Sequence, residues 1–245
     1  MHALTASQLL AVWEQGADQP LVRRALLLLA AACQDETAAD LAELSIGARD
    51  MRLLALREWT FGAALTSVTD CPACQEHLEL TFQTRDLQAV PGGLPDVDGK
   101  ALTYGKDGYQ ITYRLPNSQD LIWAAESPST EAGRHALIER CLAEIDYQGR
   151  PVAVSALPVE ILDGVIMAMR DADPQADILI DLHCPACGHD WQAPFDILTY
   201  FWNEIEAWAY RTFQEIHRLA LAYGWSEADI LALSARRRQI YLAMI

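Results

Sequence analysis

The sequence predicts an α+β protein: helical N- and C-terminal segments around a split four-cysteine zinc ribbon, which carries an inserted small α/β sub-domain. Three observations support this class. Apolar residues recur at helical spacing at both ends of the 245-residue chain and alternate with polar residues in between. The tetrapeptide CPAC occurs twice, at 71–74 and 184–187. A hydrophobic fraction of 51% is enough for a buried core.

We expect five segments along the chain. They are N-terminal helices over 1–60, the first half of the ribbon over 61–84, a hairpin-plus-helices sub-domain over 85–174, the second half of the ribbon over 175–195, and C-terminal helices over 196–245.

Helix signals fill the first sixty residues. Thr5 or Ser7 can cap the first helix, Pro20 suits the first turn of the second, and one or two more helices follow as far as Trp59. From about Phe61 the apolar period changes to two, which indicates strands.

The middle of the chain mixes strands and helices. Alternating Leu78, Leu80 and Phe82 predict a half-buried strand after the first cysteine pair, and Asp107-Gly108 predicts a hairpin turn because both positions tolerate positive φ. The remaining elements expected here are a Pro/Gly loop at 90–100, helices from Asn117 or Ser118, over 129–145 and over 157–170, and a strand over 176–182.

The C-terminal part predicts helices at about 195–223, 226–233 and 235–244. The long first helix carries a wide aromatic and aliphatic stripe, for which core packing and a partner-binding surface are both open. Its members are Phe201, Trp202, Ile205, Trp208, Ala209, Phe213, Ile216, Leu219, Ala220 and Tyr223.

The two cysteine pairs predict one structural Zn²⁺ site made of Cys71, Cys74, Cys184 and Cys187. A Cys-x-x-Cys turn presents two thiolates to one tetrahedral ion, so two such turns complete the coordination. The echo continues past the cysteines, because apolar residues follow at equal distances in both copies. A closed four-sulfur site leaves no position for water, so we expect no catalysis by the metal.

Residues 75–183 separate the two pairs, far more than the roughly 15–20 residues of an ordinary ribbon. Loop closure scales with the logarithm of length, so this separation costs only about 1.5–2 kcal/mol more. Structural zinc contributes roughly 10–16 kcal/mol in model peptides. The long insertion is therefore compatible with a shared metal site.

The cysteines and the nearby histidines also fit other roles. A thioredoxin-type redox site needs its motif at a helix N-terminus, whereas both copies lie between strands; unligated thiols are the other alternative. His77, His183 and His189 could replace a ligand or donate to sulfur, although exposed strand residues are the simpler interpretation. The two remaining cysteines, Cys33 and Cys141, lie on apolar helical faces and are expected to be buried.

Composition and motifs exclude several classes of protein. With 34 acidic and 18 basic residues the formal charge is −16, which disfavours a large nucleic-acid surface. We expect a cytoplasmic protein, because the start shows no signal-peptide pattern and the longest apolar run, 25–33, is too short to cross a bilayer. Phosphate-loop, serine-hydrolase, metalloprotease and dinucleotide motifs are not found, so an enzyme is not expected.

Two stretches bring out a family resemblance: YRLPNSQDLIWAA at 113–125 and YGWSEADILALSARRRQIYLAMI at 223–245. Over 115–245, and more loosely over the N-terminal helices, the chain resembles baseplate-associated proteins of contractile phage tails and contractile injection systems, in particular the baseplate hub assembly chaperones. Such proteins also tend to carry paired Cys-x-x-Cys motifs between helical ends. The resemblance implies a non-enzymatic assembly role with hub or spike proteins as partners, without membrane or nucleic-acid binding.

By position in the matching tail, the expected partner surface comprises Trp225, Arg236, Arg237, Arg238 and Tyr241. The basic run itself is either a solvated face or a dock for an acidic partner. Three functional alternatives stay open: a permanent structural subunit of the baseplate, a zinc-ribbon adaptor for nucleic acid, and an enzyme with its site in the inserted sub-domain, which would need convergent polar groups.

Overall fold

The computed structural model describes residues 1–89 and 100–245. Most of the Pro/Gly loop expected at 90–100 lies outside these residues. The chain divides into two compact units, one formed by Met1–Glu36 with Ile197–Ile245 and the other by Thr37–Asp196. The five-segment division expected from the sequence follows composition and apolar period rather than contacts, and it stays a prediction.

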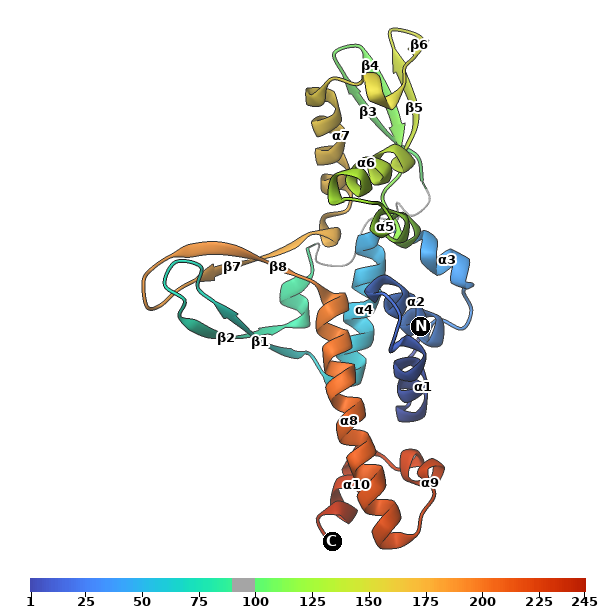
Figure 1. Ribbon diagram of the computed structural model, residues 1–245, viewed down its shortest axis with the longest axis vertical. Coiled ribbons are helices and arrows are strands. Elements are labelled where there is room, and N and C mark those ends of the chain that lie inside the picture. Colours follow the sequence, from blue (N-terminus) through green and yellow to red (C-terminus); the bar gives the residue numbers. More distant parts are fainter. Residues whose placement is uncertain (90–99) are drawn as a thin grey trace. The chain divides into compact units, whose positions relative to one another are not determined.

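The first unit is all helical (Figure 1). Its elements are α1 (Ala6–Gly16), α2 (Leu21–Ala32), α8 (Ile197–Tyr223), α9 (Glu227–Ala232) and α10 (Ala235–Leu242). Its core brings α1 onto the C-terminal helices through Leu10, Ala209, Ile216, Leu219, Ile230 and Leu242. Part of the apolar stripe on α8 is therefore buried in this core, in agreement with the core-packing interpretation of the stripe.

In its described residues, the second unit combines helices with three antiparallel sheets. Its helices are α3 (Ala38–Glu43), α4 (Ile46–Phe61), α5 (Ser118–Ala125), α6 (Thr130–Cys141) and α7 (Val159–Ala172), with short 3₁₀ turns at Thr84–Leu87, Val154–Ala156 and Pro174–Ala176. Its strands are β1 (Ala64–Asp70), β2 (His77–Gln83), β3 (Leu102–Lys106), β4 (Tyr109–Tyr113), β5 (Leu142–Tyr147), β6 (Arg150–Pro151), β7 (Ile178–His183) and β8 (Asp190–Phe195).

Side-chain caps explain where many helices begin. A Ser, Thr or Asn side chain accepts a hydrogen bond from a backbone amide of the first turn and so satisfies a donor that lacks an intrahelical partner. Thr5 forms a capping box with Gln8, which settles the choice between Thr5 and Ser7. The other capping residues of this kind are Thr37, Ser45, Asn117, Ser129, Ser226 and Ser234.

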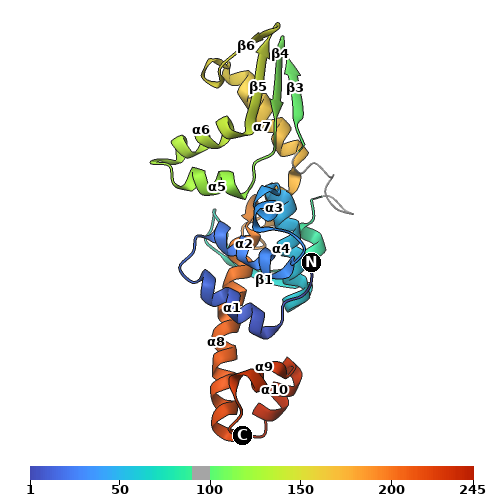
Figure 2. The ribbon, with the colours of Figure 1, turned by 90° about the vertical axis from the view of Figure 1, so that its right-hand side faces the viewer.

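The expected hairpin is confirmed. Asp107 and Gly108 have φ of 50° and 85°, the positive values of a tight turn between strands, and β3 pairs with β4 in register on either side. The sheet continues in the order β3-β4-β5-β6, with α7 on one face and α5 and α6 near its end (Figures 1 and 2).

One expected helix is wrong in its second half. The sequence predicted helix over 129–145, but α6 ends at Cys141 and Leu142–Tyr147 form β5. Ile111 and Ile145 face each other across β4 and β5, and both are buried in the core beneath α7. Pairing with β4 thus overrides a local pattern that suits a helix, which is a non-local effect.

No helix in the described part of the chain is long and apolar enough to span a membrane.

Candidate metal centre

Two β-hairpins present the cysteines. β1 and β2 pair in antiparallel register from Ala64↔Gln83 to Asp70↔His77, and β7 and β8 pair from Ile178↔Phe195 to His183↔Asp190. The CPAC sequences occupy the connections at the tips. In Figure 1 the two hairpins are neighbours, with β7 and β8 drawn above β1 and β2.

The two tips have the same backbone design. The Cys71 amide donates to Glu76 O and the Gln75 amide to Cys71 O, each at 2.9 Å. In the second tip, Cys184 donates to His189 O and Gly188 to Cys184 O, also at 2.9 Å. The repeat in sequence is thus a repeat in structure.

The same tight turn needs a left-handed residue after the second cysteine of each pair. Gly188 meets this need with φ of 74°, whereas Gln75 adopts φ of 62° with a side chain in place. Glycine has no Cβ penalty in this region, so the second tip is the less strained copy.

The predicted equivalence extends along the strands. Phe82 and Phe195, which stand at equal distances past the second cysteine of their pairs, meet edge to face with ring centroids 5.7 Å apart. This contact packs one hairpin against the other away from the sulfurs.

The four sulfurs converge. Cys71 Sγ lies 3.7 Å from Cys187 Sγ, and Cys74 Sγ lies 3.6 Å from Cys184 Sγ, so each close contact joins the two hairpins. All four Sγ atoms lie within 4.8 Å of one another. A disulfide needs about 2.05 Å, so these contacts are not disulfides.

The spacing fits a single tetrahedral ion. Bonds of about 2.3 Å to a central ion place tetrahedral sulfurs about 3.8 Å apart, close to the two shortest separations. Cys71 and Cys184 are buried, while Cys74 and Cys187 are exposed. The cluster can therefore hold a metal ion at the edge of the hairpin pair, reachable from solvent on one side.

The thiols also have unequal acidities. Burial opposes ionisation of Cys71, but hydrogen bonds from the backbone amides of Cys74 and Ala73 outweigh it and lower the pKa of that thiol to about 7. The Glu76 amide favours the Cys74 thiolate, but the neighbouring thiols prevail and raise the pKa of Cys74 to about 12. Four adjacent thiolates repel one another, so a cation is needed for all of them to ionise together.

The histidines near the tips do not join the sulfur cluster. His77 Nδ1 pairs with Asp70 at 2.8 Å and His183 Nδ1 with Asp190 at 2.7 Å, all four side chains being largely exposed. The His189 ring instead stacks on Trp191 at 6.0 Å. Their interpretation as exposed residues of the hairpins thus agrees with the structure.

Sequence reasoning missed the two histidine–aspartate pairs. The signal was present, because DCPAC is followed by His77 whereas HCPAC is followed by Asp190: the same two positions are filled in opposite order. In each hairpin the histidine and the aspartate stand directly opposite each other and are hydrogen-bonded, which closes the hairpin where the cysteines begin.

The predicted partner surface lies on the C-terminal helices. Arg236 and Arg237 are exposed, and Trp225 and Tyr241 are half-buried, with ring centroids 4.9 Å apart. Arg238 is buried, donating to Glu215 Oε2 and Leu233 O at 2.9 Å each. The Arg238 guanidinium pairs with Glu215 inside the helical unit. It is therefore not available to a partner.

The two remaining cysteines are buried, as expected. Cys33 ends α2 and Cys141 ends α6. Burial, with the nearby Asp120 carboxylate, raises the pKa of Cys141 to about 12, so this thiol stays protonated.

These features define a class of protein: an α+β chain in which two β-hairpins from distant parts of the sequence meet at four cysteines able to bind one metal ion. The family model described as "T4 bacteriophage base plate protein" matches residues 5–202. The chain belongs to this family. No curated protein and no solved structure gave a significant match.

Proposed function

We propose that this protein is a non-enzymatic, zinc-binding assembly factor for the baseplate or hub of a phage-tail-like contractile injection system. The observation that supports it most is the four-sulfur cluster in a member of a baseplate family. The cluster ties together two hairpins that are separated by residues 84–177, and so serves the shape of the molecule rather than a reaction.

Zinc is the metal we propose for the cluster. Four thiolates are soft ligands, and a tetrahedral set of four sulfurs is the usual structural zinc site. Such a site has no open position for a substrate or water, which supports a structural role for the ion and a non-enzymatic role for the protein.

The partners we propose are hub or spike proteins, met in the cytoplasm during assembly. Membership in the family supports partners within the baseplate. It is equally compatible with the alternative that this chain is a permanent baseplate subunit.

Quantitative mass spectrometry of purified particles separates these roles. We expect the chain to be absent or far below stoichiometry in finished particles, while deletion of its gene reduces particle yield. Recovery of a fixed integer number of copies per particle would instead establish a permanent subunit.

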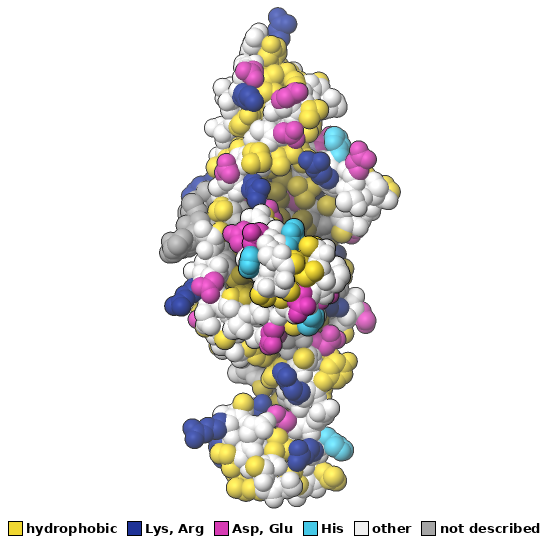
Figure 3. Space-filling model, turned by 90° about the vertical axis from the view of Figure 1, so that its left-hand side faces the viewer, with side chains coloured by type: hydrophobic (Ala, Val, Ile, Leu, Met, Phe, Trp, Pro, Cys, Tyr) yellow, Lys and Arg dark blue, Asp and Glu magenta, His cyan; other side chains and the backbone are white. Residues whose placement is uncertain are grey.

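A nucleic-acid adaptor is the less supported alternative. Acidic and histidine side chains gather on the cysteine hairpins, which face the viewer at mid-height in Figure 3. Asp70, Glu76, Glu79, Asp181 and Asp190 all belong to these hairpins, and acidic side chains repel phosphate. Salt-dependent binding of duplex DNA at micromolar protein would revive this alternative.

A further inference from the structure

The C-terminal helices differ in charge from the rest of the chain. Residues 197–245 contain five arginines and five acidic residues, so the whole formal charge of −16 is carried by residues 1–196. Within this nearly neutral part, Glu215 is neutralised by Arg238 and also accepts from Gln239 at 2.6 Å. Four arginines and four acidic residues then remain in residues 197–245, so a positive surface is local: Arg211 and Arg218 are exposed on one stretch of α8.

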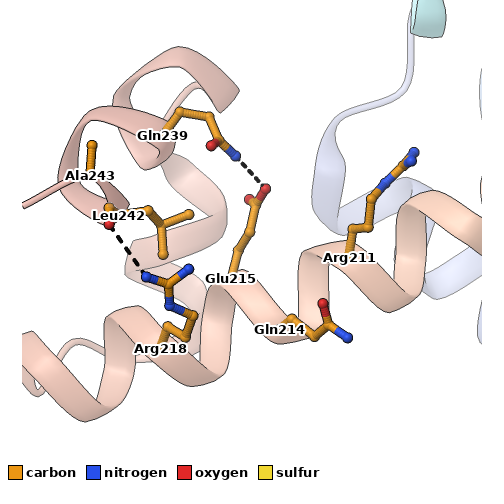
Figure 4. Close-up of a pocket in the computed structure, with 7 residues that line it drawn as sticks. All are labelled: Arg211, Gln214, Glu215, Arg218, Gln239, Leu242 and Ala243. Atoms are coloured by element: carbon orange, nitrogen blue, oxygen red, sulfur yellow. Dashed lines mark hydrogen bonds between the residues drawn. The ribbon is translucent and has the colours of Figure 1, made fainter. Parts of the chain in front are cut away.

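A pocket of about 340 Å³ lies between α8 and α10 (Figure 4). Its lining residues are Arg211, Gln214, Glu215, Arg218, Gln239, Leu242 and Ala243. Arg218 makes one long hydrogen bond, 3.5 Å to Leu242 O, and Arg211 has no partner among the residues described. Two exposed guanidinium groups are thus available in one pocket.

An exposed leucine lies on the same stripe of α8 as the arginines of the pocket. Arg211, Gln214, Arg218 and Leu221 are spaced i, i+3, i+7 and i+10 and therefore follow one stripe of α8. Leu221 is 80% exposed.

In Figure 3 basic and hydrophobic side chains lie next to each other on these helices, at the lower end of the view. We call the pocket between α8 and α10, together with Arg211, Gln214, Arg218 and Leu221 on one stripe of α8, the α8–α10 groove.

We propose that the α8–α10 groove binds an acidic amphipathic helix of a baseplate partner. The two arginine positions are seven residues apart, about 10.5 Å along the helix, which matches carboxylates two turns apart on a second helix. The exposed Leu221 supplies apolar contact beside the two arginines, as a helix-in-groove complex requires. The inference deepens the proposed function and rests on it, because it names the surface and the chemistry of the partner.

Peptide binding tests the proposal. The probes are overlapping 20-residue synthetic peptides that cover the baseplate proteins expressed from the neighbouring genes, and binding to the full chain is measured by fluorescence anisotropy at two salt concentrations. We expect the bound peptides to carry acidic residues two turns apart with apolar residues between them. Binding should weaken as salt is raised.

Variants locate the binding surface. Arg211→Glu with Arg218→Glu should weaken binding at least about tenfold, and Leu221→Ser, which removes an exposed side chain, should weaken it several-fold. Arg23→Glu is the matched control, since Arg23 is an exposed arginine on α2 in the same unit, and it should change binding less than about twofold. Circular dichroism and thermal melting check that each variant folds.

Several outcomes overturn the proposal: no bound peptide, bound peptides without acidic residues, equal losses for the groove and control variants, or preferential binding of duplex DNA. Co-purification of the intact chain with baseplate proteins tests the broader role separately. If the double variant still recovers them, the groove is wrong while the proposed function stands; if the unaltered chain recovers none, the proposed function fails.

Discussion

At the scale of single residues, two buried cysteines have different roles because their neighbours differ. Cys71 and Cys141 are both buried cysteines, but Cys71 meets three other sulfurs, whereas Cys141 meets an aspartate that keeps its thiol protonated. Whether a cysteine belongs to the candidate metal site thus depends on its neighbours rather than on burial. A cysteine outside the cluster provides a control for one inside it.

Cys71→Ser should abolish stoichiometric zinc and lower the thermal midpoint, because removing one of four ligands opens the site and weakens the link between the hairpins. Cys33→Ala, which removes a buried sulfur outside the cluster, should retain one zinc per chain. Elemental analysis of both purified proteins and thermal melting provide the measurement. Full metal content in the Cys71 variant would contradict the assignment.

Asp50 is a buried carboxyl whose protonation favours the folded state. Burial raises the pKa of Asp50 to about 6; Arg49 opposes the rise, and the Asp196 and Asp173 carboxylates add to it. The folded chain therefore holds a proton between about pH 4 and 6 that the unfolded chain has lost, so the contribution of this group to the free energy of unfolding falls as pH rises through that window.

Asp50→Asn exposes this dependence. Urea denaturation of both proteins should show the wild type gaining stability relative to the variant as pH falls from 7 to 4.5. A shift of about two pKa units corresponds to at most about 3 kcal/mol. A difference that does not change with pH would mean that Asp50 titrates normally in the folded chain.

At the scale of elements, ion pairs in the second unit join helices and a strand that the sequence patterns treat as separate elements. Asp120 of α5 is fully buried; it accepts from Arg114 at 2.5 and 2.8 Å, just after β4, and from Arg140 of α6 at 2.9 Å. Burial disfavours the carboxylate, but hydrogen bonds from Arg114, Arg140 and the Asn117 amide outweigh it and lower the pKa of Asp120. This residue therefore connects α5, α6 and the sheet.

Asp120→Asn should destabilise the protein by roughly 3–5 kcal/mol, because it removes the charge that compensates two partly buried arginines. Asp181→Asn is the matched control on an exposed strand position, where its bond to Gln192 should be worth less than about 1 kcal/mol. Urea denaturation at pH 7 measures both. Equal losses would show that the Asp120 network adds nothing beyond a surface contact.

The sequence predicts elements well where the determinants are local. Thr5, the Asp107-Gly108 turn and the CPAC turns carry their own geometry, and the structure places each as expected. β5 was missed because its conformation depends on Ile111 across the sheet rather than on its neighbours in the chain.

The same distinction applies to the candidate sites. The cysteine cluster could be predicted because a repeated short motif is visible in the sequence, whatever the distance between its copies. The burial of Arg238 could not be predicted from the sequence, because its partner Glu215 lies on another helix and no local pattern links the two residues. The groove between α8 and α10 likewise exists only after those helices pack.

At the scale of the whole molecule, the candidate metal site encloses a long internal stretch of chain. Closing it brings together hairpins that end and begin at Gln83 and Ile178, with the four-stranded sheet and α5 to α7 in between. Apart from the sulfurs, contacts between the hairpins include the Phe82–Phe195 ring pair. Two-stranded hairpins are marginally stable alone in water, so we expect this pair to depend on the ion.

Chelation should therefore loosen the hairpins selectively. Hydrogen exchange of the zinc-loaded and chelator-treated chain, read by mass spectrometry, should show faster exchange over β1–β2 and β7–β8 after metal removal. Exchange over α7 and β4, whose core of Ile111, Ile161 and Val165 is independent of the sulfurs, should change little. Uniform loosening would mean that the ion maintains the entire unit, and unchanged exchange in the hairpins would mean that their own packing suffices without metal.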